Sequence, residues 1–308
     1  MNELRFDGKV AVITGAGRNL GRAYALLLAS RGAKVVVNDI GVGISDTDGV
    51  AEAPAINPAF DVVAEITAAG GHAVADAHSI TDAGPDGGAA IVQTALDAFG
   101  RIDIVINNAG VVRQAPVPEL SDEFCRAMTD THMLGTMNVT RVAWPHLAAQ
   151  GCGRIVNVSS GAGLIGFPNM TMYGGVKLGV VGLSRAMAVE GRASGIVVNV
   201  VAPQASVRGS DFGPMKWTPA LAEWLSPEQI SGLVAYLAHE SCTTTGELFN
   251  VGGGLIARVV LAAAEGVQER PMTPEAVAAH WDEIMGQPVR EAPAGRAIGR
   301  KMMQGYQP

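Results

Sequence analysis

A chain of 308 residues can bury a large core, and its 22 basic against 29 acidic side chains, a net charge of −7, give no positive surface for nucleic acid or an anionic membrane. Three cysteines without paired spacing predict neither a disulfide framework nor a zinc site, and we expect no bound metal. No apolar run has the length of a membrane span and no leader pattern opens the chain, so we expect a cytoplasmic protein that binds a small molecule.

Short β-rich runs alternate with amphipathic segments along most of the chain. Strands are predicted at 9–15, 34–39, 72–77, 102–110, 154–160, 196–203 and 247–253. Helices are predicted at 19–31, 59–69, 86–99, 121–149, 171–192 and 226–239. Most of the strands are apolar without alternation, as strands buried on both faces of a parallel sheet are. This pattern predicts an α/β protein with a doubly wound, seven-stranded parallel sheet and helices on both faces.

Two long connections interrupt this alternation. Residues 40–58 are rich in Gly, Asp and Pro and predict an inserted surface loop. Residues 204–225 follow the sixth strand at the carboxyl edge of the sheet, where open α/β folds bind ligands, and they are a candidate substrate lid. The apolar side chains of this segment would contact a substrate or simply pack the lid itself: Phe212, Pro214, Met215, Trp217, Leu221 and Trp224.

The chain continues well beyond the last predicted strand. In this part Thr273 and Pro274 are typical of a helix start, and an apolar stripe follows them. We therefore expect one domain over 1–254 and a C-terminal extension over 255–308, whose helix packs on the domain or on a partner subunit.

The segment TGAGRNLGRAY, directly after the first strand, has the composition of a phosphate-binding turn. Glycines 15, 17 and 21 leave room for a pyrophosphate beside the backbone, and the following helix N-terminus favours its negative charge. Asn19 stands where a glycine might be expected. Asparagine tolerates a left-handed backbone better than other side chains, so we expect the turn to keep its shape.

The acidic residue Asp39 ends the second strand. A carboxylate at that position accepts hydrogen bonds from the adenosine ribose hydroxyls and repels a 2′-phosphate, which favours NAD. Arg18 instead favours NADP, since a cation beside the ribose could hold the 2′-phosphate of that cofactor. The sequence predicts NAD and leaves NADP open.

A tyrosine and a lysine lie on one face of the fifth predicted helix, at positions i and i+4. The pair is Tyr173 and Lys177, and a neighbouring cation is expected to lower the pKa of the phenol. Ser160 ends the fifth strand, and Asn107–Gly110 end the fourth strand at the same sheet edge. The tyrosine is thereby a candidate acid or base near neutral pH.

Taken together, these motifs resemble the short-chain dehydrogenase/reductase family over about residues 6–254. The resemblance implies a single Rossmann domain in which Tyr173 exchanges the substrate proton, Ser160 binds the substrate oxygen and Lys177 holds the nicotinamide ribose. His132 stands where most members carry a relay asparagine; it would keep the relay, or be a helix-interior histidine bonded to a carbonyl. The implied cofactor-binding residues are Gly15, Gly17, Arg18, Asn19, Leu20, Gly21, Asp39, His78, Ser79, Asn108, Ala109, Gly110, Tyr173, Lys177 and Pro203.

The residue that contacts adenine is left open by the resemblance. Family members carry an aspartate after the third strand, whereas Asp76, His78 and Ser79 are all near that position here. The glycine loop also departs from the usual TGxxxGxG, because Asn19 replaces the middle glycine.

Within the family, the sequence is most similar to the (3R)-hydroxyacyl-CoA dehydrogenase type found as a domain of peroxisomal multifunctional β-oxidation enzymes. The segments HMLGTMNVTRVAWPH, APQASVR and HESC carry this similarity. It implies NAD-dependent oxidation of a (3R)-3-hydroxyacyl-CoA, with Arg208 and Lys216 as candidates to meet the CoA phosphates. The chain ends in QGYQP rather than a peroxisomal signal, which favours a free-standing cytoplasmic enzyme.

Two alternatives and an assembly state accompany this interpretation. A hydroxysteroid dehydrogenase acting on a free ring hydroxyl or ketone would use the same residues. A nucleotide-binding regulator without catalysis would need a broken Ser, Tyr or Lys position, and all three are intact. Members of the family commonly pair through two helices, which implies a homodimer or homotetramer paired here through the helices at 121–149 and 171–192.

Overall fold

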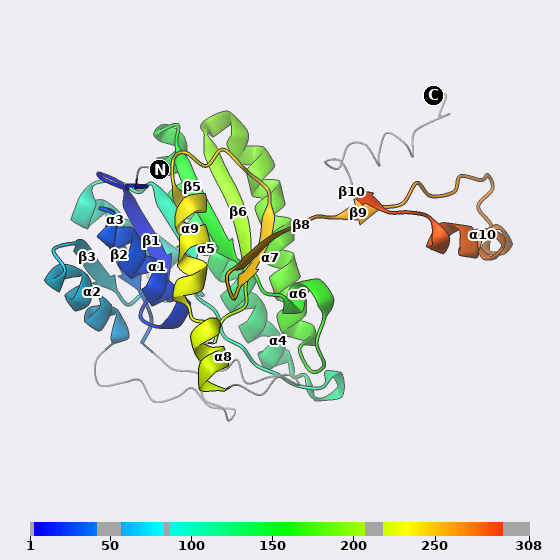
Figure 1. The fold of residues 1–308 in the computed structure, drawn as a ribbon, viewed down its shortest axis with the longest axis horizontal. Coiled ribbons are helices and arrows are strands. Elements are labelled where there is room, and N and C mark those ends of the chain that lie inside the picture. Colours follow the sequence, from blue (N-terminus) through cyan, green and yellow to red (C-terminus); the bar gives the residue numbers. More distant parts are fainter. Residues whose placement is uncertain (1–2, 42–56, 83–86, 207–217, 292–308) are drawn as a thin grey trace. The chain divides into compact units, whose positions relative to one another are not determined.

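The computed structural model describes residues 3–41, 57–82, 87–206 and 218–291 (Figure 1). The chain divides into two compact units, Met1–Arg258 and Val259–Pro308, and each is considered by itself. The predicted surface loop lies almost wholly outside the described residues. So does half of the candidate lid, residues 207–217, including Arg208, Phe212, Lys216 and Trp217.

The first unit is built on one sheet in the order β3-β2-β1-β4-β5-β6-β7-β8 (Figure 1). The chain runs outward from β1 on both sides, and every pairing from β3 to β7 is parallel, as expected for a doubly wound α/β fold. The strands are β1 (Val10–Thr14), β2 (Lys34–Asn38), β3 (His72–Asp76), β4 (Ile104–Asn107), β5 (Gly153–Val158), β6 (Ile196–Pro203), β7 (Leu248–Gly252) and β8 (Leu255–Val259).

The eighth strand is one more than the seven predicted. Gly253 and Gly254, with φ of 56° and 79°, turn the chain directly after β7, so β8 returns beside it. The residues after 254 therefore begin with a strand of this sheet, although they were expected to belong to the extension.

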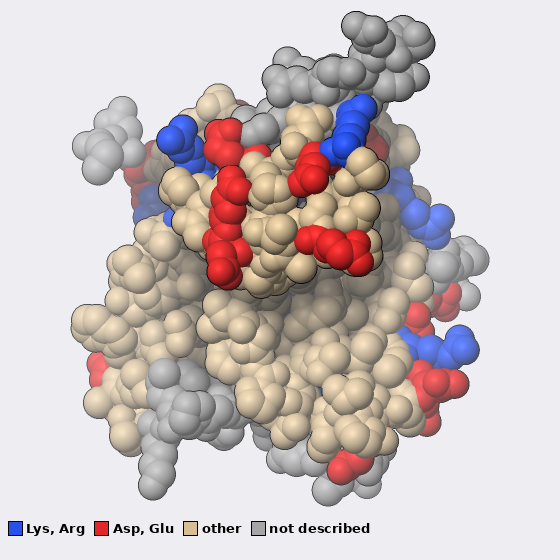
Figure 2. Space-filling view, turned by 90° about the vertical axis from the view of Figure 1, so that its right-hand side faces the viewer, with Lys and Arg blue, Asp and Glu red and all other residues tan. Residues whose placement is uncertain are grey.

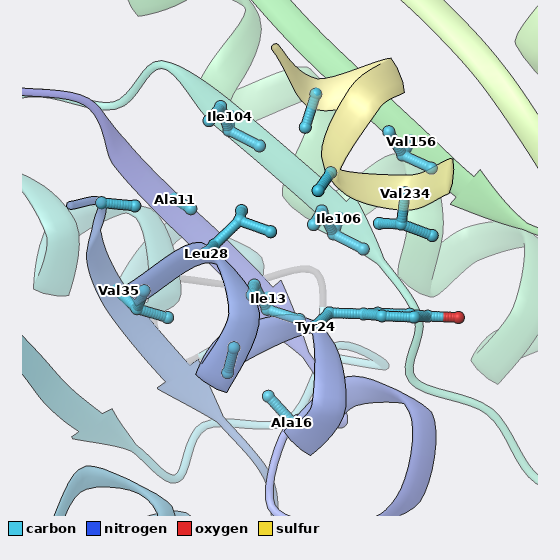
Figure 3. Packing of buried hydrophobic residues seen from close by; sticks show 14 of the residues in the cluster. Ala11, Ile13, Ala16, Tyr24, Leu28, Val35, Ile104, Ile106, Val156 and Val234 are labelled. Carbon is cyan, nitrogen blue, oxygen red and sulfur yellow. The ribbon is translucent and has the colours of Figure 1, made fainter. Parts of the chain in front are cut away.

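Helices cover both faces of the sheet, and successive side chains of β1 pack against the helices of opposite faces. Ala11 and Ile13 point into a cluster with α1 (Asn19–Ser30), α2 (Pro58–Ala68) and α9 (Glu228–Ala238). Figure 3 shows Tyr24 and Leu28 of α1 lying in this cluster beside Val234 of α9. On the other face, Val10 and Val12 pack with α3 (Gly88–Phe99), α5 (Gly135–Ala149) and α7 (Thr171–Glu190).

The helix predicted over 121–149 is interrupted. It comprises α4 (Asp122–Thr129), a π-helical turn over Asp130–Leu134, and α5. Shorter elements complete the unit: two 3₁₀ turns (Val117–Glu119 and Gly191–Ser194), α6 (Ala162–Ile165) and α8 (Pro219–Trp224).

The second unit contains the predicted C-terminal helix. This helix, α10 (Pro274–Gly286), begins as expected, because the Thr273 hydroxyl accepts a hydrogen bond from the Ala276 amide at 3.1 Å. Two short strands, β9 (Ala262–Ala263) and β10 (Arg290–Glu291), pair antiparallel in the same unit.

Figure 2 shows how charged side chains are distributed on one face of the molecule. Basic side chains there are scattered among acidic and uncharged residues and form no continuous patch. None of the described helices is both long and apolar enough to cross a membrane.

Candidate active site

The end of β5 and the first turns of α7 hold the predicted catalytic side chains together. The Lys177 ammonium donates to the backbone carbonyl of Val158 at 2.9 Å, and the Ser159 hydroxyl donates to the carbonyl of Lys177 at 2.7 Å. Ser160 follows at the carboxyl end of the strand, where its Oγ accepts from the Ala162 amide at 3.2 Å. These bonds fix α7 against the sheet edge that carries Ser160.

Lys177 is buried almost completely, with 4% of its surface exposed. Burial disfavours the ammonium and lowers the pKa of Lys177 from 10.5 to about 7. A lysine with that pKa can take up and release a proton near neutral pH. The side chain is therefore suited to moving a proton as well as to binding a hydroxyl.

Tyr173 lies on the same face of α7, with the Lys177 Nζ 5.7 Å from its ring centroid. The expectation that the cation lowers the pKa of this phenol is wrong for this structure. Burial raises the pKa of Tyr173 and outweighs the hydrogen bond with Ser160, which lowers it. The burial comes from an apolar cluster around the ring that includes Met128, Met170 and Val176.

His132, in the π-helical turn, completes this group. Its ring meets the Tyr173 ring edge to face at a centroid distance of 5.5 Å. Nε2 lies 2.8 Å from the Val111 carbonyl, which can only accept, so Nε2 carries the hydrogen and Nδ1 is left as an acceptor. Nδ1 is buried and has no partner among the described residues. Burial and the nearby Lys177 hold the pKa of His132 well below its usual value.

Gly110 makes the position of His132 possible. A Cβ at residue 110 would lie 2.6 Å from the His132 Cε1 and 3.6 Å from the Lys177 Nζ. A side chain there would therefore occupy the space shared by the imidazole and the ammonium.

The glycine-rich loop keeps the shape that the sequence predicts. Gly15 and Asn19 both have left-handed backbones, with φ of 61° and 47°. Cβ atoms at Gly15 and Gly21 would lie 2.7 Å from the Ala109 Cα and 2.6 Å from the Asn108 Nδ2. The loop is thus packed directly on the end of β4.

Thr14 joins the glycine loop to the end of β4. Its hydroxyl accepts from the amides of Asn108 and Ala109, each at 3.1 Å, and the Asn108 side chain donates to the carbonyls of Thr14 and Gly15. Sequence reasoning missed Thr14; a hydroxyl at the end of an otherwise apolar strand is the signal that would have found it.

Asp39 faces the glycine loop directly. Its carboxylate accepts from the Gly17 amide at 3.0 Å and from the Gly41 amide at 2.9 Å. A glycine amide at the loop and an acceptor at the end of β2 are the donor and acceptor set that a dinucleotide needs for its pyrophosphate and ribose. Arg18 and Leu20 belong to the loop, and Pro203 ends β6, so the residues present fit a nicotinamide dinucleotide.

The end of β3 is organised by Asp76, which was named only as a neighbour of the adenine site. This buried carboxylate holds the backbone and the ring of His78, while Ser79 and Thr81 bond to each other. The structure therefore brings Ser160, Tyr173, Lys177 and His132 into one group, and the glycine loop and Asp39 into another.

Comparison with known proteins identifies the family. A family model described as short chain dehydrogenase matches residues 9–208. Over 285 residues the chain is 43% identical to peroxisomal multifunctional enzyme type 2 of Mus musculus, covering 91% of this chain and 37% of that protein. It is 39% identical to the peroxisomal hydratase-dehydrogenase-epimerase of Neurospora crassa, covering 92% of this chain and 30% of that protein.

A solved structure agrees with the sequence comparisons. Full-length peroxisomal multifunctional enzyme type 2 from Drosophila melanogaster matches with a TM-score of 0.79 and 31% identity, over 98% of this chain and 50% of that chain. This chain thus spans half or less of the length of these multifunctional relatives. With the family model matching most of the sheet and the site, the chain belongs to the short-chain dehydrogenase/reductase family and is an oxidoreductase that acts on a CH–OH group.

Proposed function

We propose that this enzyme oxidises the 3-hydroxyl of a (3R)-3-hydroxyacyl-CoA to the 3-keto thioester with NAD. The observation that carries the proposal is the convergence of Ser160, Tyr173 and Lys177 at the sheet edge that also holds the glycine loop. The names of the relatives support a dehydrogenase of the multifunctional β-oxidation type.

NAD is the proposed cofactor because of Asp39. The glycine loop would hold the pyrophosphate, and Asp39, which already accepts two backbone amides, would accept the ribose hydroxyls. A 2′-phosphate would bring negative charge against this carboxylate, which disfavours NADP. When bound, NAD supplies the hydride acceptor.

The chain's own residues orient the alcohol and move its proton. Ser160 and Tyr173 would both hydrogen bond to the 3-hydroxyl, and Tyr173 would receive its proton. Because the phenol is protonated at neutral pH in this structure, its proton must leave before oxidation, and Lys177 is the neighbouring group with a pKa near 7. His132 would extend this path through its free Nδ1.

Apolar surface near Ser160 supports an acyl substrate. The segment after Ser160 exposes Ile165 and Phe167, which are 78% and 42% accessible, and Trp224 of α8 is 66% accessible. In this proposal these side chains form part of the surface that contacts the acyl chain. The proposed contacts of Arg208 and Lys216 with CoA phosphates fall outside the described residues.

The test is NADH formation with (3R)- and (3S)-3-hydroxyacyl-CoA thioesters and a free hydroxysteroid, each with NAD and with NADP. We expect turnover of the (3R)-thioesters with NAD. Tyr173→Phe should lower kcat/KM by about 100-fold or more, whereas Tyr236→Phe, on the exposed face of α9, should not. Activity on the free steroid alone would replace this proposal with the hydroxysteroid alternative.

We further propose that the enzyme is a homodimer that pairs through α7. Leu178, Gly182 and Val189 lie on the outer face of this helix, and Leu178 is 50% and Val189 64% exposed. Light scattering at micromolar concentration should give at least twice the mass of the chain, and a peak of monomer mass would refute the pairing. A cytoplasmic location stays a prediction, since the relatives named above are peroxisomal.

A further inference from the structure

A tight turn leads from the segment after α6 into α7. It is closed by the Met170 amide, which donates to the Phe167 carbonyl at 3.2 Å. Pro168 and Asn169 form the middle of the turn, and Asn169 has a φ of 63°, in the left-handed region. Proline followed by a left-handed residue at these two positions is the pattern of a type II turn. The turn therefore depends on a residue at 169 that tolerates a positive φ.

Asn169 contributes to this turn through its backbone. Among the described residues, only Asn19 and Asn169 combine a side chain with a positive φ. Asparagine adopts this conformation more readily than most residues that have a side chain, and glycine adopts it more readily still. The Asn169 side chain is exposed and hydrogen bonds to no described residue. The conformational preference of asparagine thus accounts for its place in the turn.

The turn fixes the start of the helix that carries Tyr173. Met170 immediately precedes α7, and its carbonyl accepts from the Gly174 amide at 2.7 Å. Its side chain is buried and belongs to the same apolar cluster as the Tyr173 ring. A change in the turn would therefore move the first turn of α7, where the tyrosine lies.

The turn is also tied to the segment after β4. The Asn169 carbonyl accepts from the Ala115 amide at 2.9 Å. Four residues earlier in that segment, the Val111 carbonyl bonds to the His132 ring at 2.8 Å. The backbone of residue 169 thus links two segments that both reach the group around Tyr173.

The first residue of the turn lies on the surface proposed above to contact the acyl chain. Phe167 is 42% exposed, and it shares this surface with Ile165. One turn therefore connects an apolar side chain of that surface with the helix of the proposed proton acceptor, Tyr173.

We propose that Asn169 is a positioning residue for the oxidation. Its left-handed backbone closes the turn that places Phe167 against the acyl chain and holds Tyr173 at the 3-hydroxyl. This inference rests on the proposed function, because it needs the roles given there to Phe167 and Tyr173. Asn169 acts through the shape of the backbone and makes no contact with the substrate.

The test is a series of substitutions at residue 169 that separates the backbone from the side chain. Asn169→Gly removes the amide group but adopts a positive φ freely, so its kcat should stay within about twofold of the wild type. Asn169→Ala should lower kcat about threefold or more, and the β-branched Asn169→Val about tenfold or more. If Phe167 moves with the turn, Asn169→Val should raise the KM of a long-chain thioester more than that of a short-chain one.

Gly100→Ala is the matched control. Gly100 has a φ of 73° at the end of α3, and a Cβ there would meet no atom within 4 Å. The substitution therefore imposes a similar backbone penalty at the opposite edge of the sheet from the site, and kcat should be unchanged.

Three results would overturn the inference: equal kcat across the series, the same loss in Asn169→Gly as in Asn169→Ala, or an equal loss in Gly100→Ala. If Asn169→Val does not fold, the comparison of the glycine and alanine variants still decides. The series is measured on whichever alcohol the wild type oxidises, so inactivity toward thioesters would replace the proposed substrate without affecting this comparison. A wild-type rate in Tyr173→Phe would instead refute the proposed proton transfer.

Discussion

Lys177 is expected to reduce the stability of the fold at and below neutral pH. Because its pKa falls from 10.5 in the unfolded chain to about 7 in the folded one, the unfolded state binds more protons between these values. Below about pH 7 both states are protonated and the cost of burying the ammonium is fully present. As the pH rises toward 10.5 this cost disappears.

The size of the cost follows from the shift in pKa. At about 1.4 kcal/mol per pH unit, the change from 10.5 to about 7 sets an upper limit of about 5 kcal/mol. The hydrogen bond to the Val158 carbonyl offsets part of this, since leaving that carbonyl without a partner costs about 1–3 kcal/mol. We expect Lys177→Met to raise the free energy of unfolding by about 2 kcal/mol near pH 6 while abolishing turnover.

Urea denaturation of both proteins across the pH range tests this reasoning. The stability advantage of Lys177→Met should shrink as the pH rises from about 7 to about 9.5. Lys34→Met, which removes an ammonium that is not buried, should show no such change in slope. A Lys177→Met protein less stable than the wild type at every pH would refute the burial argument.

Three further variants test the site. Asp39→Asn should lower the preference for NAD over NADP about tenfold, measured as the ratio of the two kcat/KM values, and an unchanged ratio would remove Asp39 from cofactor selection. Gly110→Ala should cost about 1–3 kcal/mol in urea denaturation, because its Cβ meets the His132 ring, whereas Gly232→Ala in the open face of α9 should stabilise by about 0.5–1 kcal/mol. His132→Phe should lower kcat about tenfold or more, and His132→Asn should restore part of the rate; equal kcat in all three proteins would exclude a relay.

Local patterns were enough to predict most of the fold and the placement of the main site residues. Runs of apolar residues predicted the parallel strands, and their carboxyl ends placed the glycine loop, Asp39 and Ser160 at one edge. The left-handed backbone of Asn19 was also predictable, because it depends on the intrinsic preference of one residue type.

Features that depend on distant contacts could not be predicted in the same way. The pKa of Tyr173 is raised because Met128, which is remote in sequence, packs in the same cluster as the ring and helps to exclude water from it. Asp76 organises the end of β3 because the sheet and α3 bring Asn38 and Thr94 within hydrogen-bond distance of its carboxylate. Burial by such neighbours is a property of the folded chain and has no local pattern.

The π-helical turn at Asp130–Leu134 limits the deletions and insertions that this region can accept. A π turn accommodates one residue more than an α turn, so the residues on its two sides differ in phase by about 100° from those of an uninterrupted helix. Deleting one residue there would let α4 and α5 join in a single regular register. The same deletion would rotate every side chain on one side of it, and His132 and the core-facing residues of α5 could no longer both keep their places. Insertions and deletions in this segment would thus be constrained more strictly than substitutions.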